Sequence, residues 1–291
     1  MDFDIHLYKQ KLISLLYEFD ALSKKYNIRY YLYAGSALGA IRHQGIIPWD
    51  DDIDVVVPRP DYERLIELSK DKTLFNDVEI VSIYTDANYN YPFAKLYDKN
   101  TTLIESAKTM YVGGVFIDIF PLDGVPCDES EKIKHLHRYT KARCILLGLT
   151  EGRPAIKECT SFHKTLYRLK CDLYKLLFNK KKQILKCESI AKTYFYDAST
   201  LVCPFHSIYG YKDITKKDYF QQGRICDFDG LKVVCPLEAE KFLTGLYGDY
   251  MTPPPPNERY PHHQPYFINL ERRMSLLEIQ QITTTNNACF I

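Results

Sequence analysis

Four aspartates stand together just before an apolar run of the sequence. Asp50, Asp51 and Asp52 are consecutive, and Asp54 follows Ile53 and precedes three valines. On a strand, Asp52 and Asp54 would alternate with Ile53, so both carboxylates would point to the same face. Two such carboxylates repel each other and resist removal from water unless a divalent cation or solvent neutralises them. A solvated turn would explain the first three aspartates, but not Asp54, which lies beyond the turn.

A further carboxylate interrupts an apolar segment later in the chain. Asp118 lies between Ile117 and Ile119, where a hydrogen-bonded structural acid is the ordinary explanation. Together with Asp52 and Asp54, it makes a set of three carboxylates from two neighbouring strands. Hard oxygen ligands of this kind suit Mg²⁺ or Mn²⁺, and such a site clamps phosphate oxygens and activates an oxygen nucleophile. The sequence therefore predicts a divalent-metal site at these three aspartates.

Gly35 and Ser36 stand where a β-branched and aromatic segment, 28–34, gives way to a short helix at 37–42. Backbone N–H groups at a helix N-terminus suit a phosphate group. A lone Gly-Ser pair is a weak signal, but its position ahead of two acidic strands strengthens it. We therefore expect this turn to bind phosphate.

Hydrophobic periodicity and breaker residues outline the elements that must position these groups. We expect helices at 4–26, 61–70 (with Asp61 as its N-cap) and 236–247, strands at 53–57, 78–84, 92–97, 101–105 and 115–120, two long helices within 129–195, a hairpin near 227–232, and an extended proline segment at 253–256. This order predicts an α/β (α+β) fold with a mixed β-sheet flanked by helices. We divide it into a catalytic core at 1–128, a helical segment at 129–195, and a C-terminal segment at 196–291 that folds back on the core.

Composition narrows the class of protein. Of the 291 residues, 46% are hydrophobic and 26% are charged, which is typical of a folded globular chain. The formal charge of +1 argues against a nucleic-acid partner. Nine cysteines at irregular spacings contain no Cys-x-x-Cys unit, which argues against a zinc ribbon and favours a reducing compartment. With neither a signal peptide nor a long apolar stretch in the sequence, we expect a cytoplasmic protein.

The order of these motifs resembles a known family. A Gly-Ser at a helix start, an acidic pair on the next strand and a third acid on a later strand form the pattern of the nucleotidyltransferase fold. Residues 35–57, which read GSALGAIRHQGIIPWDDDIDVVV, closely resemble the LicD family, which has fukutin-related protein as a distant relative. The matching features continue at 58–62, 94–96, 114–123 and 247–251. The resemblance covers most of the chain and is weakest in the helical middle.

The resemblance implies transfer of a phospho-substituent, such as phosphocholine, from a CDP-linked donor such as CDP-choline to a hydroxyl of a cell-surface glycan or its lipid-linked precursor. It implies that Asp52, Asp54 and Asp118 hold Mg²⁺ against the donor diphosphate while CMP leaves. A nucleotidyltransferase that activates a small phosphate with CTP would share this fold and metal site. A non-enzymatic binding module is a third hypothesis, against which the intact set of acids argues.

Four basic side chains are candidates to bind the donor phosphates: Arg42, His43, Arg59 and Lys95. An unpaired ammonium would be costly at Lys95, which lies on an apolar strand, so it either offsets phosphate charge or pairs with a core acid. Arg59, between two prolines, either binds phosphate or braces the end of the strand. His43 has a surface role as its alternative.

Other residues near these motifs have two interpretations each. Trp49 either stacks on a base or a choline-like group, or packs. His262 and His263 follow the prolines and form a lid or an acceptor site, or lie on the surface. We expect Asp50 and Asp51 to support the metal ligands from behind, with direct ligation by Asp50 as an alternative.

The helical middle is strongly basic. Residues 157–192 contain ten Lys or Arg against three Asp or Glu, with leucines at 166, 169, 173, 176 and 177. A basic amphipathic helix can lie on an anionic membrane surface, where a lipid-linked acceptor would be found. The alternative is a helix whose leucines pack inward and whose basic face is solvated.

Overall fold

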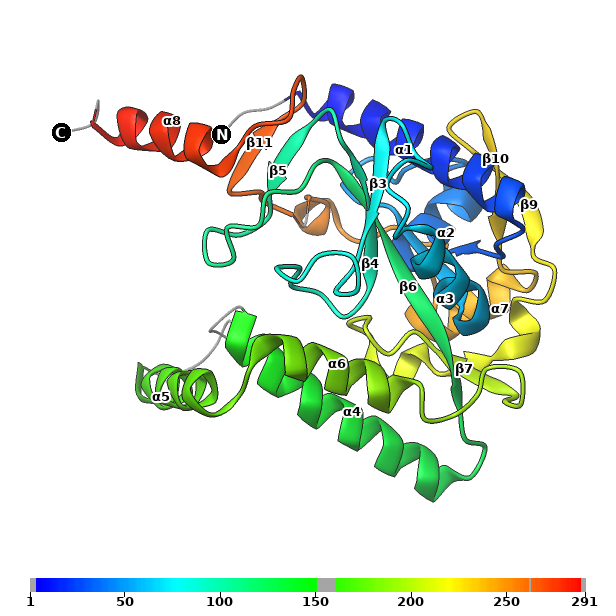
Figure 1. Cartoon of the computed structure of the whole chain (residues 1–291). Coiled ribbons are helices and arrows are strands. Elements are labelled where there is room, and N and C mark those ends of the chain that lie inside the picture. Colours follow the sequence, from blue (N-terminus) through cyan, green and yellow to red (C-terminus); the bar gives the residue numbers. More distant parts are fainter. Residues whose placement is uncertain (1–3, 151–160, 262, 289–291) are drawn as a thin grey trace.

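A mixed β-sheet forms the centre of the chain in the computed structural model, which describes residues 4–150, 161–261 and 263–288 (Figure 1). The strand order is β1-β2-β6-β4-β3. The strands are β1 (Tyr31–Leu32), β2 (Asp54–Pro58), β3 (Val78–Val81), β4 (Ala94–Asp98) and β6 (Phe116–Val125). Strands β2 and β6 are parallel, and the other pairs along this path are antiparallel. The mixed α/β fold expected from the sequence is confirmed.

Strand β6 is the longest strand of the sheet and links it to a second group of strands. Its first half lies between β2 and β4, and its end pairs with β7 (Leu201–Cys203), which in turn pairs with β8 (Thr215–Lys216). Val55, Val56 and Val57 of β2 are fully buried. Strands covered on both faces read as continuous apolar runs, so an acid within them is costly and its position informative.

Eight α-helices surround these strands in the described residues. They are α1 (Ile5–Tyr26), α2 (Ala34–Arg42), α3 (Arg59–Leu68), α4 (Glu129–Thr150), α5 (Ser161–Leu177), α6 (Lys180–Ala191), α7 (Ala239–Tyr247) and α8 (Leu276–Ala288). Helix α1 packs its leucines against β4 and β6. Helices α4, α5 and α6 form a separate group at the bottom of Figure 1, where α4 contacts both others. No helix in the described ranges is both long enough and apolar enough to span a membrane.

Residues near the C-terminus lie against the N-terminal part of the chain. Strand β11 (Phe267–Asn269) pairs with β5 (Thr102–Ile104), and α7 contacts α2. A hairpin of β9 (Arg224–Phe228) and β10 (Leu231–Cys235) also contacts β1 and α2. Segments that are distant in sequence therefore converge near the start of β2.

The structure corrects several predicted bounds. The helix expected at 37–42 begins at Ala34, so Gly35 and Ser36 lie inside its first turn. The prediction of Asp61 as an N-cap was wrong, because α3 begins at Arg59 and the Asp61 carboxylate instead accepts a hydrogen bond from Arg29 Nε at 2.5 Å. The helical segment 129–195 holds three helices, α4, α5 and α6, rather than the two that we expected.

Candidate active site

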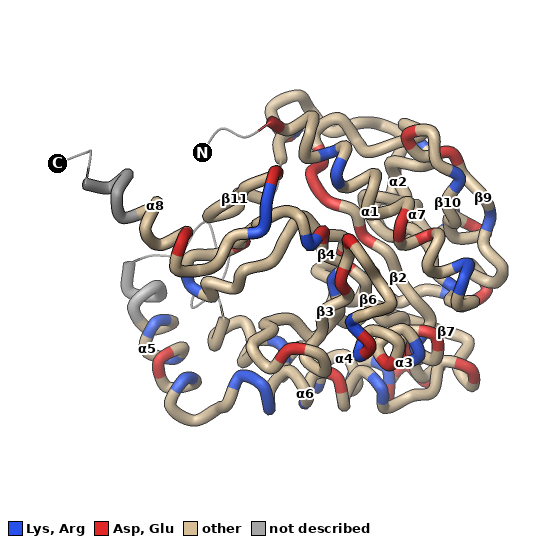
Figure 2. Tube along the Cα trace, turned by 45° about the horizontal axis from the view of Figure 1, so that its top comes forward, with Lys and Arg blue, Asp and Glu red and all other residues tan. Residues whose placement is uncertain are grey.

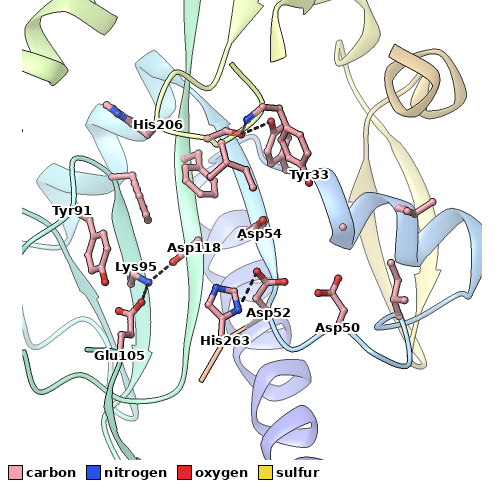
Figure 3. Close-up of a pocket in the computed structure, with 18 of the residues that line it drawn as sticks. Tyr33, Asp50, Asp52, Asp54, Tyr91, Lys95, Glu105, Asp118, His206 and His263 are labelled. Atoms are coloured by element: carbon pink, nitrogen blue, oxygen red, sulfur yellow. Dashed lines mark hydrogen bonds and ion pairs between the residues drawn. The ribbon is translucent and has the colours of Figure 1, made fainter. Parts of the chain in front are cut away.

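One large cavity, of about 1120 Å³, lies at the start of β2. Its walls come from α2, β4, β6 and α4, and from the segments 47–54, 206–209 and 247–254. Four aspartates line its acidic end: Asp50, Asp52, Asp54 and Asp118 (Figure 3). The three aspartates that the sequence predicted as metal ligands therefore line one cavity, together with Asp50.

Asp54 and Asp118 are direct neighbours in the parallel register of β2 and β6. The N–H of Asp118 donates to the carbonyl of Ile53 at 3.0 Å, which holds the two strands together beside the acids. The Ser36 hydroxyl accepts the N–H of Asp54 at 2.8 Å. Ser36 is buried and does not line the cavity, so its contact orients the start of β2 rather than facing a phosphate.

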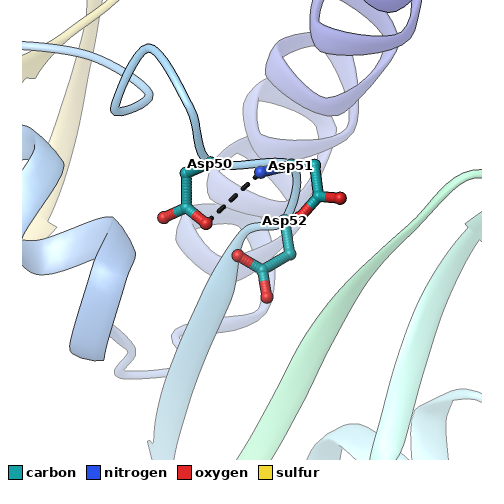
Figure 4. Close-up of side chains that lie close together, drawn as sticks. All are labelled: Asp50, Asp51 and Asp52. Atoms are coloured by element: carbon teal, nitrogen blue, oxygen red, sulfur yellow. Dashed lines mark hydrogen bonds between the residues drawn. The ribbon is translucent and has the colours of Figure 1, made fainter. Parts of the chain in front are cut away.

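Asp50, Asp51 and Asp52 precede β2 and bring carboxylate oxygens within 4.8 Å of one another (Figure 4). Asp50 and Asp52 line the cavity, whereas Asp51 is absent from its lining and accepts both the backbone N–H of His263 at 2.9 Å and its ring Nδ1 at 3.0 Å. Only Asp54 lies within the strand. The predicted Asp52–Asp54 alternation therefore spans the strand boundary, yet both residues reach the same cavity.

Burial and mutual repulsion dominate the electrostatics of these acids. They raise the pKa of Asp50 to about 7, and they raise the pKa values of Asp52, Asp54 and Asp118. Hydrogen bonding to Asp51 raises the pKa of His263 to about 9, so this imidazole carries a positive charge beside the acids. Carboxylates crowded in this way fit a divalent cation, because hard oxygen donors with uncompensated negative charge are what Mg²⁺ and Mn²⁺ prefer.

Lys95 on β4 is the cation buried deepest beside the acids in the described part of the chain. Its Nζ lies 2.9 Å from Asp118 Oδ1 and 3.1 Å from Glu105 Oε2 (Figure 3). Burial lowers the pKa of Lys95, but attraction to these two carboxylates outweighs it, so the pKa lies above its usual value. The ion pairs confirm the pairing with acids, and contact between Lys95 and a donor phosphate stays a prediction for this cavity residue.

Arg42 also lines the cavity, next to Trp49. Its Nη1 donates to the carbonyl of Tyr250 at 2.5 Å, and its guanidinium lies 5.9 Å from the centre of the Trp49 ring. Arg259 lies 5.0 Å from the same ring, and His43 contacts it edge-on without lining the cavity. Trp49 itself lines the cavity.

Arg59 lies outside the cavity lining, in a buried ion-pair network. Its Nε and Nη2 donate to the two carboxylate oxygens of Asp123 at 2.6 and 2.7 Å, and its Nη1 lies 3.2 Å from Glu188 Oε2. These contacts join α3, β6 and α6. They support the bracing role considered for Arg59, not the phosphate role. His262 lies outside the described residues.

Several cavity residues were not among the candidate site residues that the sequence indicated. Aromatic side chains cover much of the wall: Tyr33, Tyr91, Phe93, Phe120, Tyr209, Tyr247 and Tyr250. Arg143 of α4, His206 and Glu105 also line it. Aromatic residues are frequent throughout this chain, so no spacing separates wall residues from core residues. Glu105 ends an expected strand, and only its position opposite Lys95 shows its importance.

Comparison with known proteins agrees with this geometry. Residues 27–143 match the family described as LicD/FKTN/FKRP, nucleotidyltransferase domain. The lipopolysaccharide cholinephosphotransferase LicD of Haemophilus influenzae is 30% identical over 269 residues, which cover 88% of this chain and 96% of that protein. The chain belongs to the LicD family.

Two shorter similarities cover a small part of the chain. An uncharacterised protein of Rickettsia prowazekii is 46% identical over 57 residues, which are 20% of this chain and 21% of that protein. One of Rickettsia typhi is 46% identical over 50 residues, which are 17% and 16%. The region that matches the LicD family holds the aspartates, Lys95 and Glu105, whereas His206, the 247–254 wall and His263 lie beyond it.

Gly35 leaves room for Asp50 in this LicD-family site. A Cβ at position 35 would lie 2.7 Å from Asp50 Oδ2. We expect Gly35→Ala to displace the Asp50 carboxylate and lower turnover roughly tenfold or more, since small misplacements in a site are costly. Steady-state kinetics measure this effect. Gly245→Ala in α7 is the matched control, because nothing lies within 4 Å of its added Cβ, and equal activity losses in the two variants would contradict the prediction.

The carboxyl of Asp213, which contacts the cavity residue Tyr33, should make a pH-dependent contribution to the stability of the fold. It is 1% exposed and accepts a hydrogen bond from the Tyr33 hydroxyl. Burial raises its pKa from 3.8 to about 6. A raised carboxyl pKa means that the folded state favours the neutral acid, so this contribution is present below about pH 4 and is lost as the pH rises through 6.

We therefore expect Asp213→Asn to increase the free energy of unfolding relative to the parent chain, by at most about 3 kcal/mol at neutral pH and by little near pH 4. Urea unfolding at both pH values measures the difference. A difference of the same size at both would show that the carboxyl does not titrate as described.

Proposed function

We propose that this LicD-family chain transfers phosphocholine, or a related phospho-alcohol or phosphonate, from a CDP-linked donor to a hydroxyl of a cell-surface glycan or its lipid-linked precursor. One observation carries the proposal: a single cavity joins an oxygen-rich acidic end to an aromatic wall. The similarity to a lipopolysaccharide cholinephosphotransferase along 88% of the chain supports the same class of reaction.

The acidic end is suited to the donor diphosphate. Mg²⁺ or Mn²⁺ would be held by Asp52, Asp54 and Asp118, with Asp50 beside them. The cation would neutralise the negative charge of the diphosphate and the charge that develops on CMP. Lys95 and Arg42 line the same cavity and add positive charge. Without such compensation, a diphosphate could not approach four aspartates.

The rest of the cavity suits the transferred group and the acceptor. Tyr91 and Phe93 line the cavity together with Lys95. Aromatic rings of this kind attract a quaternary ammonium through cation–π contacts. The acceptor oxygen attacks the phosphorus that bears the substituent, and the bond from that phosphorus to the CMP oxygen breaks. Asp118 is our candidate to accept the acceptor's hydroxyl proton. Positioning and electrostatics supply most of the catalysis in such transfers.

The test is release of CMP from CDP-choline and related CDP-alcohols, with cell-envelope glycan as acceptor, in Mg²⁺ and in EDTA. We expect Mg²⁺-dependent CMP from one donor and the matching substituent on the glycan. Pyrophosphate release from CTP, with no CMP from any donor, would replace the proposal with a nucleotidyltransferase. Thermal stabilisation by CDP-choline and the related CDP-alcohols with Mg²⁺ measures donor binding even when the acceptor is wrong, and its absence with all of these donors would also contradict the proposal.

A further inference from the structure

Among the described side chains of helix α5, residues 166–177, the buried and half-buried ones before Phe178 lie on one face. Cys171 is buried, and Tyr167 and Tyr174 on the same side are half-buried. The approach to α4 is close, because a Cβ on Gly148 would lie 2.9 Å from the Tyr174 ring and 3.5 Å from Cys171 Sγ. The close contact between α5 and α4 therefore comes from the side of α5 that carries Cys171 and Tyr174.

Five leucines form a stripe on the other side of α5. We call these residues the leucine stripe, and their exposed fractions are 56% for Leu166, 62% for Leu169, 51% for Leu173, 81% for Leu176 and 63% for Leu177. With 3.6 residues per turn, these positions gather roughly opposite Cys171. The sequence left open whether they pack inward, and the structure places them outward. A contiguous exposed apolar patch indicates an interaction surface.

Cations lie on both sides of the leucine stripe, but at different distances from it. Helical geometry places Lys170 directly beside the stripe, and it places Arg168 and Lys175 on the other side, beyond Asp172; all three cations are exposed. Further lysines follow in α6: Lys181, Lys182 and Lys186 are exposed, and Lys180 is half-buried and donates to Asn90 Oδ1. Figure 2 colours the lysines and arginines of this region blue. The only acid from 166 to 187 is Asp172, whose Oδ1 lies 3.3 Å from Lys175 Nζ. The surface around the stripe is therefore strongly positive.

The packed face of α5 lies against the helix that forms part of the cavity wall. Leu146, Leu147 and Thr150 of α4 line the cavity, and Gly148, among them in sequence, touches α5. Helix α4 therefore lies between α5 and the cavity, so a surface bound to the outer side of α5 would be separated from the cavity by these two helices.

We propose that the leucine stripe and its bordering cations dock this protein on an anionic lipid bilayer. The leucines enter the boundary between headgroups and acyl chains, while Arg168, Lys170 and Lys175 contact lipid phosphates. Charge complementarity selects this occupant, because a second copy of the same surface would bring like charges together. The proposal concerns a surface outside the cavity and does not depend on which group the protein transfers.

The experiment is co-sedimentation of the full chain with two kinds of vesicle, phosphatidylcholine alone and phosphatidylcholine with about one third phosphatidylglycerol. We expect binding to the anionic vesicles to be roughly tenfold or more tighter than to the neutral ones, and to weaken as salt is raised from about 0.1 M to about 1 M. No binding to anionic vesicles at the lower salt would overturn the proposal.

Variants separate the apolar and the electrostatic contributions. Leu169→Gln with Leu173→Gln and Leu176→Gln should weaken vesicle binding roughly tenfold or more, because each exposed leucine contributes buried apolar area in the membrane. Ile225→Gln is the matched control, since Ile225 is 63% exposed on the distant β9 strand. Arg168→Gln with Lys170→Gln and Lys175→Gln should remove most of the preference for anionic vesicles.

The fold and self-association are checked on the same samples. The substituted leucines are exposed, so we expect an unchanged thermal midpoint and far-UV spectrum. Vesicle binding by the leucine variant equal to that of the parent chain would overturn the proposal. So would a dimer in sedimentation experiments that the leucine substitutions dissociate, since it would assign the stripe to a second copy of the chain.

Discussion

We expect Asp54→Asn to abolish turnover while leaving the protein folded. Asp54 shares the acidic end of the cavity with Asp50, Asp52 and Asp118, and its half-buried carboxyl is repelled by all three. The amide keeps the shape of the side chain but removes the negative charge that a divalent cation requires. Loss of one such electrostatic contact typically costs roughly a hundredfold to a thousandfold in rate, and we expect the loss here to be at least that large.

The same substitution should not destabilise the metal-free protein. Relief of carboxylate repulsion offsets the change in hydrogen bonding, so we expect an equal or higher thermal midpoint in EDTA. Mg²⁺ should raise the midpoint of the parent chain and leave that of the variant almost unchanged. The exposed Asp218→Asn, outside the cavity, is the control for the loss of one negative charge. Near-normal CMP release by Asp54→Asn would show that Asp54 is not part of the metal site.

Arg59→Met should have the opposite result, a large loss of stability. Arg59 is 7% exposed and binds Asp123 and Glu188, whose side chains are 0% and 3% exposed. Removing the guanidinium leaves two buried carboxylates without their main partner, although His206 and Lys192 remain near Glu188. Breaking a buried ion pair from one side costs about 3–5 kcal/mol, which is a large part of the total stability of a typical domain.

Urea unfolding compares Arg59→Met with Arg29→Met. The side chain of Arg29 is 49% exposed and pairs with Asp61, which keeps a second partner in Arg64, so the loss of Arg29 should cost less than about 1 kcal/mol. Similar losses for the two variants would contradict the bracing role. If Arg59→Met instead keeps its stability and raises the KM for the CDP-linked donor, Arg59 binds donor phosphate.

Local sequence patterns were sufficient to identify the acids of the site and to predict the class of fold. Asp54 and Asp118 stand out because each interrupts an apolar run, where a carboxylate is costly without a compensating partner. Their β-branched neighbours also predict the strands that carry them. The parallel pairing of β2 and β6 then places Asp54 opposite Asp118, as expected for acids on neighbouring strands. Strand positions and interrupted apolar runs are properties of short segments, so the composition and periodicity of each segment are enough to predict them.

Contacts between distant segments required the tertiary structure. Arg59 had two plausible roles until its partners were located 64 and 129 residues away, on β6 and α6. The aromatic wall joins segments that share no spacing in the sequence. Helical periodicity shows that the leucines of α5 lie on one side of the helix, but not whether that side packs inward. The fit of Tyr174 and Cys171 against Gly148 decided which face packs, because a helix buries the face whose shape matches its neighbour, and that neighbour is set by the rest of the fold.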